Sequence, residues 1–337
     1  MVQNYIRFKA PCYFVLFLMK FRNKSGLSFV LVPLLLLSKA TYSEPWFTGP
    51  ILAPSGETTP MEHVNVEIYD FATKNNGVYN RHGKLTPSPS SESNQYQVLY
   101  YYGFTTWMDM QLTLPYVFNS ASGHHGQGYG DTGVLLGFQI LRQNKRRWMP
   151  DLRVSIQETL PSGRYDMLNP AFFGTGLTGK GSYQTTFTLA FQHLTPVFQT
   201  HYFRTRFTVN YTIPGTVNIQ GLSAYAGSTS TQGHINPGSN FSLDLAAEYT
   251  VTQNWVAVME GYYFYGNATR FRGEKGITKV GKLARVGYPD NDEISLAPAI
   301  EYNFSNNVGI IAGYWYSIAG RKIARFRAPT IALNLYW

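Results

Sequence analysis

The sequence has almost no cysteine, few charged residues and no long hydrophobic run. Cys12 is the single cysteine among 337 residues, so stability must come from backbone pairing and packing rather than from disulfide bonds. Charged residues make up 14% of the chain, against ~25% in typical soluble domains. The apolar run at residues 27–37 is too short for a membrane-spanning helix, which needs ~18 apolar residues or more. If this protein crosses a membrane, it crosses as strands.

Apolar and polar residues alternate in many segments of the ~10-residue length typical of a barrel strand. The clearest segments are 108–116, 203–211 and 241–251, and alternation gives each strand one apolar and one polar face. With the three clearest segments and the final strand, eight further segments bring the number to about twelve. These eight begin near His63, Gln95, Asp131, Asp151, Ser182, Asn254, Glu293 and Asn307. Aromatic clusters at strand ends, such as Tyr100–Tyr102, 262–265 and 314–316, predict two interfacial girdles.

Connections of two lengths alternate along the chain. The long ones are 73–93, 119–129, 161–181, 213–238, 266–291 and 318–325. In outer-membrane barrels the long loops face outward and the short turns face the periplasm, whereas a soluble β-sandwich has no reason to sort its loops. We therefore predict an all-β fold: a transmembrane up-and-down antiparallel β-barrel of about 12 strands, with short periplasmic turns and long extracellular loops. Both termini are then periplasmic, in a bacterial outer membrane.

The N-terminal region divides into two expected segments before the barrel, which we assign to residues 62–337. Residues 1–43 combine a basic stretch with the apolar run and small residues at cleavage spacing, which predicts a signal peptide; Met19 is a possible true start. This segment holds six of the 28 basic residues and no acidic one. The remainder has 22 basic residues against 19 acidic ones, so no nucleic-acid partner is expected. Residues 44–61 are a Pro-rich periplasmic lead-in or a plug that enters the lumen through Trp46, Phe47, Ile51 and Leu52.

The last strand carries a pattern of its own. Ile331, Leu333 and Leu335 alternate with polar or small residues, and the chain ends on Trp337. This pattern resembles the C-terminal assembly signal of bacterial outer-membrane barrels, which implies the barrel-assembly machinery as a partner.

Two short motifs resemble a known family. Gly130-Asp-Thr-Gly-Val-Leu-Leu-Gly137 and the Pro/Gly-rich stretch Gly49-Pro-Ile-Leu-Ala-Pro-Ser-Gly56 are similar to the outer-membrane "transporter" family named after the meta-pathway of phenol degradation. The resemblance implies an outer-membrane barrel that moves small hydrophobic compounds. It transfers no functional residue to this chain.

The polar faces group their charges, and two interpretations stay open. Opposed acidic and basic groups in an open pore would order polar solutes and gate ions; alternatively, the groups pair and hold the barrel closed. The candidates that line the lumen are Asp109, Gln111, Arg153, Arg204, Arg206, Asp244, Glu248, Glu260 and Glu301.

Basic residues gather in two of the expected outer loops. Facing outward, they could contact lipopolysaccharide phosphates through charge-assisted hydrogen bonds, or they could simply be solvated. These candidates are Arg270, Arg272, Lys275, Lys279, Lys282, Arg285, Arg321 and Lys322. Outer-membrane lipid and lipopolysaccharide are the expected surroundings.

Other motifs indicate no cofactor. Gly174-Thr-Gly-Leu-Thr-Gly-Lys180 has the spacing of a phosphate-binding loop, but Gly181 stands where the Ser or Thr is needed, and a flexible outer loop is the better interpretation. His124 and His125 are adjacent and would point apart on a strand, so no metal site is expected.

The function that these patterns favour is a passive channel for small hydrophobic or aromatic molecules, with no catalytic residue. A structural or adhesive barrel with a closed lumen is an alternative. An outer-membrane hydrolase such as a phospholipase is a second alternative, although none of the seven His is followed two residues later by Ser, and no G-x-S-x-G or H-E-x-x-H occurs.

Overall fold

The computed structural model describes residues 47–144, 148–198 and 201–337. The expected signal peptide (residues 1–43) and Trp46 lie outside these residues. Within them the one helix is a 3-10 turn, Pro170–Phe172, and no helix is long and apolar enough to cross a bilayer.

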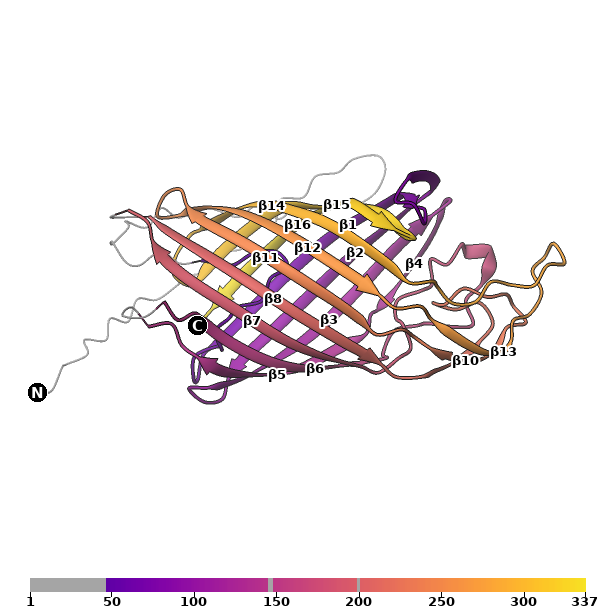
Figure 1. Cartoon of the computed structure of the whole chain (residues 1–337), viewed down its shortest axis with the longest axis horizontal. Helices are drawn as coiled ribbons and strands as arrows, with labels where there is room; N and C mark the ends of the chain where they lie inside the picture. Colours follow the sequence, from indigo (N-terminus) through magenta and orange to yellow (C-terminus); the bar gives the residue numbers. More distant parts are fainter. Residues whose placement is uncertain (1–46, 145–147, 199–200) are drawn as a thin grey trace, which may run out of the picture. The chain divides into compact units, whose positions relative to one another are not determined.

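Twelve antiparallel strands form a closed barrel, as the alternating pattern predicts. Strands that follow one another in the barrel lie side by side (Figure 1), and the last strand closes on the first through pairs such as Ile331 with Asp70 and Leu333 with Ile68. The strands are β1 Val64–Tyr79, β2 Leu85–Gly103, β3 Met108–Ala121, β5 Thr132–Leu141, β6 Asp151–Leu160, β7 Gln184–Pro196, β8 Tyr202–Pro214, β11 Asn240–Thr250, β12 Trp255–Gly266, β14 Asn291–Asn303, β15 Val308–Arg321 and β16 Ile323–Tyr336. Closure leaves no edge whose backbone groups would go unpaired in lipid.

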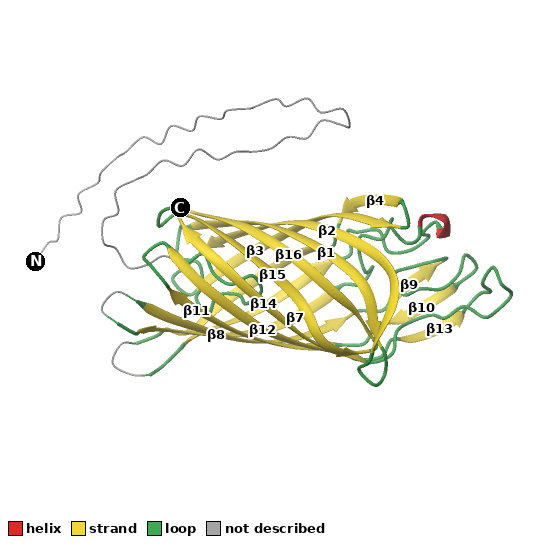
Figure 2. Ribbon diagram, turned by 90° about the horizontal axis from the view of Figure 1, so that it is seen from above, coloured by secondary structure: helices red, strands yellow, loops and turns green. Residues whose placement is uncertain are grey.

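The two ends of the barrel differ. One end, the short-turn end, carries the connections 104–107, 142–150, 197–201, 251–254 and 304–307, together with the last strand's terminus. The other, the long-loop end, carries the loops 161–183, 215–239 and 267–290. Strands β9 (Val217–Gln220), β10 (Gln232–Asn236) and β13 (Arg270–Glu274) form a separate small sheet there (Figure 2).

Three connections that the sequence analysis assigned to long loops are mostly strand. Residues 73–93 complete β1 and β2 and turn at 80–84, residues 119–129 end β3 and form β4 (His124–Tyr129), and 318–325 turn at Lys322. The apolar alternation stops in these stretches, yet backbone pairing continues beyond it. A polar hairpin in water has its ladder to stabilise it and needs no apolar face, so the pattern underestimates its length.

The two faces of the wall have opposite chemistry. Leu114, Leu189 and Leu245 point outward and are 46%, 42% and 61% exposed, whereas Thr208, Ala246 and Ser295 point inward and are fully buried. A soluble barrel has the reverse arrangement, because exposing large apolar side chains to water is unfavourable. The outward face is therefore the lipid face, and Ile331, Leu333 and Leu335 of β16 lie on it.

The loops of the long-loop end pack into a cap with its own small core. Val217, Ile219 and Ile235 are at most 3% exposed and contact Tyr225. Backbone hydrogen bonds join two loops, from Met167 N and Leu168 N to the carbonyls of residues 220 and 222, both at 2.9 Å. The loops thus fix one another in place.

Candidate functional site

Residues 47–60, the plug segment, cross the lumen near the short-turn end. The Glu260 carboxylate on β12 accepts backbone N–H groups from Ile51 (2.5 Å), Leu52 (3.0 Å) and Ala53 (2.9 Å). Glu301 on β14 accepts N–H groups from residues 48 and 49, at 2.5 and 3.2 Å. Two inward carboxylates therefore satisfy the backbone donors of a segment that has no secondary structure of its own.

The far side of the barrel holds the same segment. Asp109 on β3 accepts the N–H of Thr59 at 2.9 Å, and Gln139 on β5 accepts that of Thr58 at 2.7 Å. Between these anchors, Arg206 on β8 donates to the carbonyl of Ala53 at 2.8 Å. The plug segment is thus bonded to opposite walls of the barrel and spans the lumen.

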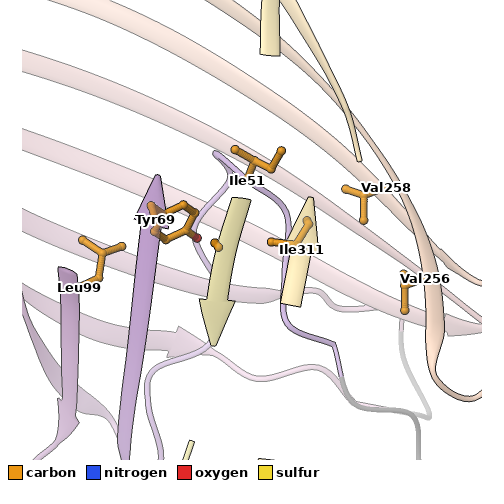
Figure 3. Close-up of a cluster of buried hydrophobic side chains, with 7 residues drawn as sticks. Ile51, Tyr69, Leu99, Val256, Val258 and Ile311 are labelled. Atoms are coloured by element: carbon orange, nitrogen blue, oxygen red, sulfur yellow. The ribbon is translucent and has the colours of Figure 1, made fainter. Parts of the chain in front are cut away.

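Apolar packing adds to these hydrogen bonds. Ile51 is 4% exposed and packs in a cluster with Tyr69, Val258 and Ile311 (Figure 3), which also contains Leu99, Val256 and Ala332. The wall facing the segment carries glycines: a Cβ at Gly309 would overlap the Thr48 side chain, and one at Gly313 would overlap Ile51. Residues 47–60 therefore lie in the lumen.

All nine lumen candidates named from the sequence are at most 9% exposed and lie on inward faces. Five of the nine form ion pairs: Arg153 with Asp109 at 2.8 Å, and Arg204 and Arg206 with Glu248 at 2.5 and 3.5 Å. Buried ions in contact stabilise each other instead of projecting a field across an open pore. The remaining candidates are polar or acidic. Glu260 and Glu301 hold the plug segment, Gln111 donates to Thr113 at 3.0 Å, and Asp244 has one oxygen without a hydrogen-bond partner.

An aromatic wall lines the lumen between the plug segment and the long-loop end. It consists of Phe71, Tyr262, Trp315 and Phe326, on the inward faces of β1, β12, β15 and β16. Trp315 lies 6.4, 6.1 and 4.7 Å from the rings of Phe71, Tyr262 and Phe326, and its indole N–H donates to Ser295 at 2.9 Å. The clustering of aromatic residues around Trp315 and Tyr262 at strand ends predicts interfacial girdles. That is wrong for these two residues, because alternate residues of a strand face opposite sides.

The lumen is hollow beside β2 and β3 near the long-loop end. A cavity of about 670 Å³, the mouth cavity, is lined by Gln95 and Gln97 of β2, Asn119 of β3 and residues 173–180. The Asn119 side chain donates to the carbonyls of residues 175 and 177, at 3.2 and 2.5 Å. Asp131 accepts the N–H groups of Gly163 (3.0 Å) and Lys180 (2.7 Å).

The Gly-rich motif at 174–180 is thus an outer loop, but side chains of Asn119 and Asp131 hold it in place, so it is not the flexible loop that the sequence predicts. It packs against glycines of the β3–β4 hairpin, because a Cβ at Gly126 would overlap the backbone of Thr175, and one at Gly128 would lie 3.3 Å from Thr178. It precedes antiparallel β7 and no helix follows it in the described chain, so it is not a phosphate-binding loop.

Most of the basic candidates for lipopolysaccharide contact are exposed at the long-loop end; Lys322 is half-buried. Arg321 pairs with Asp292, and Lys322 pairs with Asp290 at 2.7 Å. The hydrogen bond from Lys322 holds the pKa of the Asp290 carboxyl below its usual range. Across residues 47–144, 148–198 and 201–337, no three His, Cys, Asp or Glu side chains are placed to hold a metal.

A closed twelve-stranded wall with a lipid-facing exterior and a polar, paired interior defines the class: a transmembrane β-barrel of the outer-membrane, porin-like kind. Residues 75–324 match the family model described as "Putative MetA-pathway of phenol degradation". The chain belongs to this family, and the family expected from the sequence is confirmed.

A solved structure shows the same fold. The protein is similar to an outer membrane channel from Pseudomonas putida F1, with 12% identity, 86% of this chain and 100% of that chain covered, and a TM-score of 0.64. Weaker similarity links it to the transport unit of the autotransporter AIDA-I from Escherichia coli, with 11% identity, 81% and 89% covered, and a TM-score of 0.43. A TodX monoaromatic hydrocarbon channel mutant gives 14% identity, 88% and 95% covered, and a TM-score of 0.40. Comparison with curated protein sequences gives no match.

Proposed function

We propose that this barrel is a passive conduit through which small apolar molecules, including aromatic ones, cross the outer membrane. The observation that carries the proposal is the continuity of apolar surface in the lumen: the aromatic wall around Trp315 meets the cluster around Ile51 through Phe71, which stacks on Tyr69 at 5.3 Å. Aromatic side chains offer a large apolar contact area without needing a charge on the solute.

The plug segment and the paired charges then restrict ions and hydrophilic solutes. Arg153, Arg204 and Glu248 are already compensated, so an ion gains little from them, and the plug segment narrows the path at the short-turn end. The solute gradient drives transport, and no residue acts in catalysis. In this proposal the short-turn end and both termini face the periplasm, and the plug segment enters from that side.

Contacts with the surroundings follow from the same orientation. The basic residues of loop 267–290 lie at the level of lipopolysaccharide phosphates, and the exposed apolar residues of β16 are available to the assembly machinery. In a purely structural barrel the plug segment would stay in the lumen at all times. A hydrolase would turn over phospholipid. Each alternative predicts a different result in the experiment below.

The test is uptake of the apolar aromatic dye N-phenyl-1-naphthylamine by cells that make the protein. We expect faster dye entry than in cells without it, and a several-fold loss with Trp315→Ala. Trp255→Ala is the matched control, because Trp255 is 42% exposed on the outward face. Equal dye entry with and without the protein would favour the structural barrel. Phospholipid turnover by the purified protein would favour the hydrolase.

A further inference from the structure

The mouth cavity contains one ammonium group that no ion pair among the described residues engages. Lys180 lines the cavity and takes part in none of the ion pairs found among the described residues. The acidic groups at the cavity are Asp131 and Glu92. Asp131 already accepts two backbone N–H groups, and Glu92 pairs with Lys74 at 2.7 Å. Because no carboxylate of the described residues lies within ion-pair distance of the Lys180 ammonium, an anion from outside can contact it directly.

The backbone of Lys180 is also held in position before any ligand arrives. Its backbone N–H is fixed on Asp131 at 2.7 Å, and the preceding residues are fixed by the Asn119 side chain. The side chain reaches the water of the cavity, while the surrounding protein lowers the pKa of its ammonium group and the Asp131 carboxylate opposes that effect. A lysine on a fixed backbone loses less entropy when it binds an anion than a lysine on a mobile loop does.

The rest of the lining fits an apolar body rather than a second charge. Pro115, Val117, Phe173 and Leu177 line the same cavity, together with the amides of Gln95, Gln97 and Gln184. A volume of about 670 Å³ is within the range of small-molecule sites.

The Gly-rich segment offers no cradle for a phosphate. The backbone N–H groups of Leu177, Thr178, Gly179 and Lys180 all donate within the protein, to residues 174, 164, 164 and 131. A phosphate would need several such donors free, whereas a carboxylate can be bound by one ammonium and side-chain amides.

We propose that the mouth cavity is a binding station for small amphiphilic monocarboxylates, with the carboxylate on Lys180 and the apolar body against Val117, Phe173 and Leu177. This rests on the proposed function, because it makes the cavity the place where solutes first enter the conduit. It adds a substrate class, since the aromatic wall alone does not select for an anionic group.

The experiment measures binding of radiolabelled benzoate to the full-length protein in detergent by equilibrium dialysis. Lys180→Met should weaken binding by about tenfold or more, because a charge-assisted contact is lost, and Lys180→Arg should keep affinity within a few-fold. Lys282→Met is the control, since Lys282 is exposed in loop 267–290. Benzyl alcohol, which has the ring without the carboxylate, should bind all four proteins alike. Octanoate tests whether an aliphatic body serves as well. Heat-modified migration on gels checks that each variant folds.

Absence of benzoate binding, or equal affinity in the wild type and Lys180→Met, would overturn the binding station. Dye uptake by the same variants separates this result from the conduit. Dye entry without benzoate binding removes the station and leaves the conduit, whereas Lys180-dependent benzoate binding without dye entry supports the station and removes the conduit.

Discussion

Replacing the two carboxylates that hold the plug segment should release it. Glu260→Gln with Glu301→Gln keeps the shape of both side chains, but each loses an acceptor oxygen and turns an amide N–H₂ toward backbone donors. Glu260 and Glu301 together accept N–H groups from five residues, 48, 49, 51, 52 and 53. The change is therefore concentrated on the segment and leaves the barrel ladder intact.

The size of the effect follows from the hydrogen bonds. A bond to a charged group contributes about 1.5–3 kcal/mol net and a neutral one about 0.5–1.5, so five weakened bonds would lose about 5 kcal/mol. Removing two buried charges recovers part of this loss. We expect the plug segment to be held about 2–4 kcal/mol less tightly, which raises the released population by a factor of roughly 30 to 1,000.

Two measurements check the expectation. Single-channel conductance in planar bilayers should show long open events in the double variant and rare ones in the wild type. A disulfide between Ser55→Cys and Gln192→Cys, whose natural side chains are 3.4 Å apart, should form readily only while the segment is seated. Cys12 is the only natural cysteine, so after its replacement the two introduced cysteines are the only ones in the chain.

Glu92→Gln is the matched control, because Glu92 is half exposed, pairs with Lys74 and has no hydrogen bond to the plug segment. If the double variant kept both the wild-type conductance and the wild-type crosslinking yield, the carboxylates would not be what holds the segment. Packing of Ile51 would then have to account for it.

Two further expectations concern the loops and the lipid face. Asp131→Ala removes the acceptor for the N–H groups of Gly163 and Lys180, so trypsin should cleave after Lys180 several-fold faster. The control Glu274→Ala changes an exposed residue and should leave the cleavage rate unchanged. Equal cleavage rates in the two variants would mean that the glycine contacts alone hold the loop in place. Leu245→Lys places a charge on the outward face of β11 and should lower the free energy of unfolding in liposomes by about 2–4 kcal/mol, measured by urea titration. Leu283→Lys, in the outer cap and 76% exposed, should have no such effect, and a similar loss at both positions would contradict the assignment of the lipid face.

Strands and faces were predictable because each strand repeats one local rule. Alternation at 108–116 or 241–251 needs only neighbours in sequence, and it identified the inward position of Glu260 correctly. It also held for Trp315, whose inward direction follows from its neighbour Tyr314 facing out. The prediction of a girdle at residues 314–316 did not apply the rule that alternate residues of a strand face opposite sides.

The plug segment could be suspected but not placed from the sequence, because its partners are remote. Glu260 bonds to residues more than 200 positions away, and no local pattern records such a contact. One signal was present: Gly313 interrupts the inward face of β15 away from any turn, and the segment approaches it at Ile51. The segment also approaches Gly103 and Gly309, which lie at strand ends. The fixed position of loop 161–183 could not be predicted for the same reason, because Asp131 contacts the loop across about 30–50 residues of sequence.

The continuity of the plug segment with β1 has one more consequence. A bridge between Met61 and Gly103 ties the base of the segment to the wall, and the fourteen residues before it reach at most ~46–50 Å when extended. The plug segment is therefore tethered to β1. It can leave the lumen and return without diffusing away, so its rebinding is an intramolecular event at a local concentration near the millimolar range. Its rate should not depend on how many copies the membrane holds.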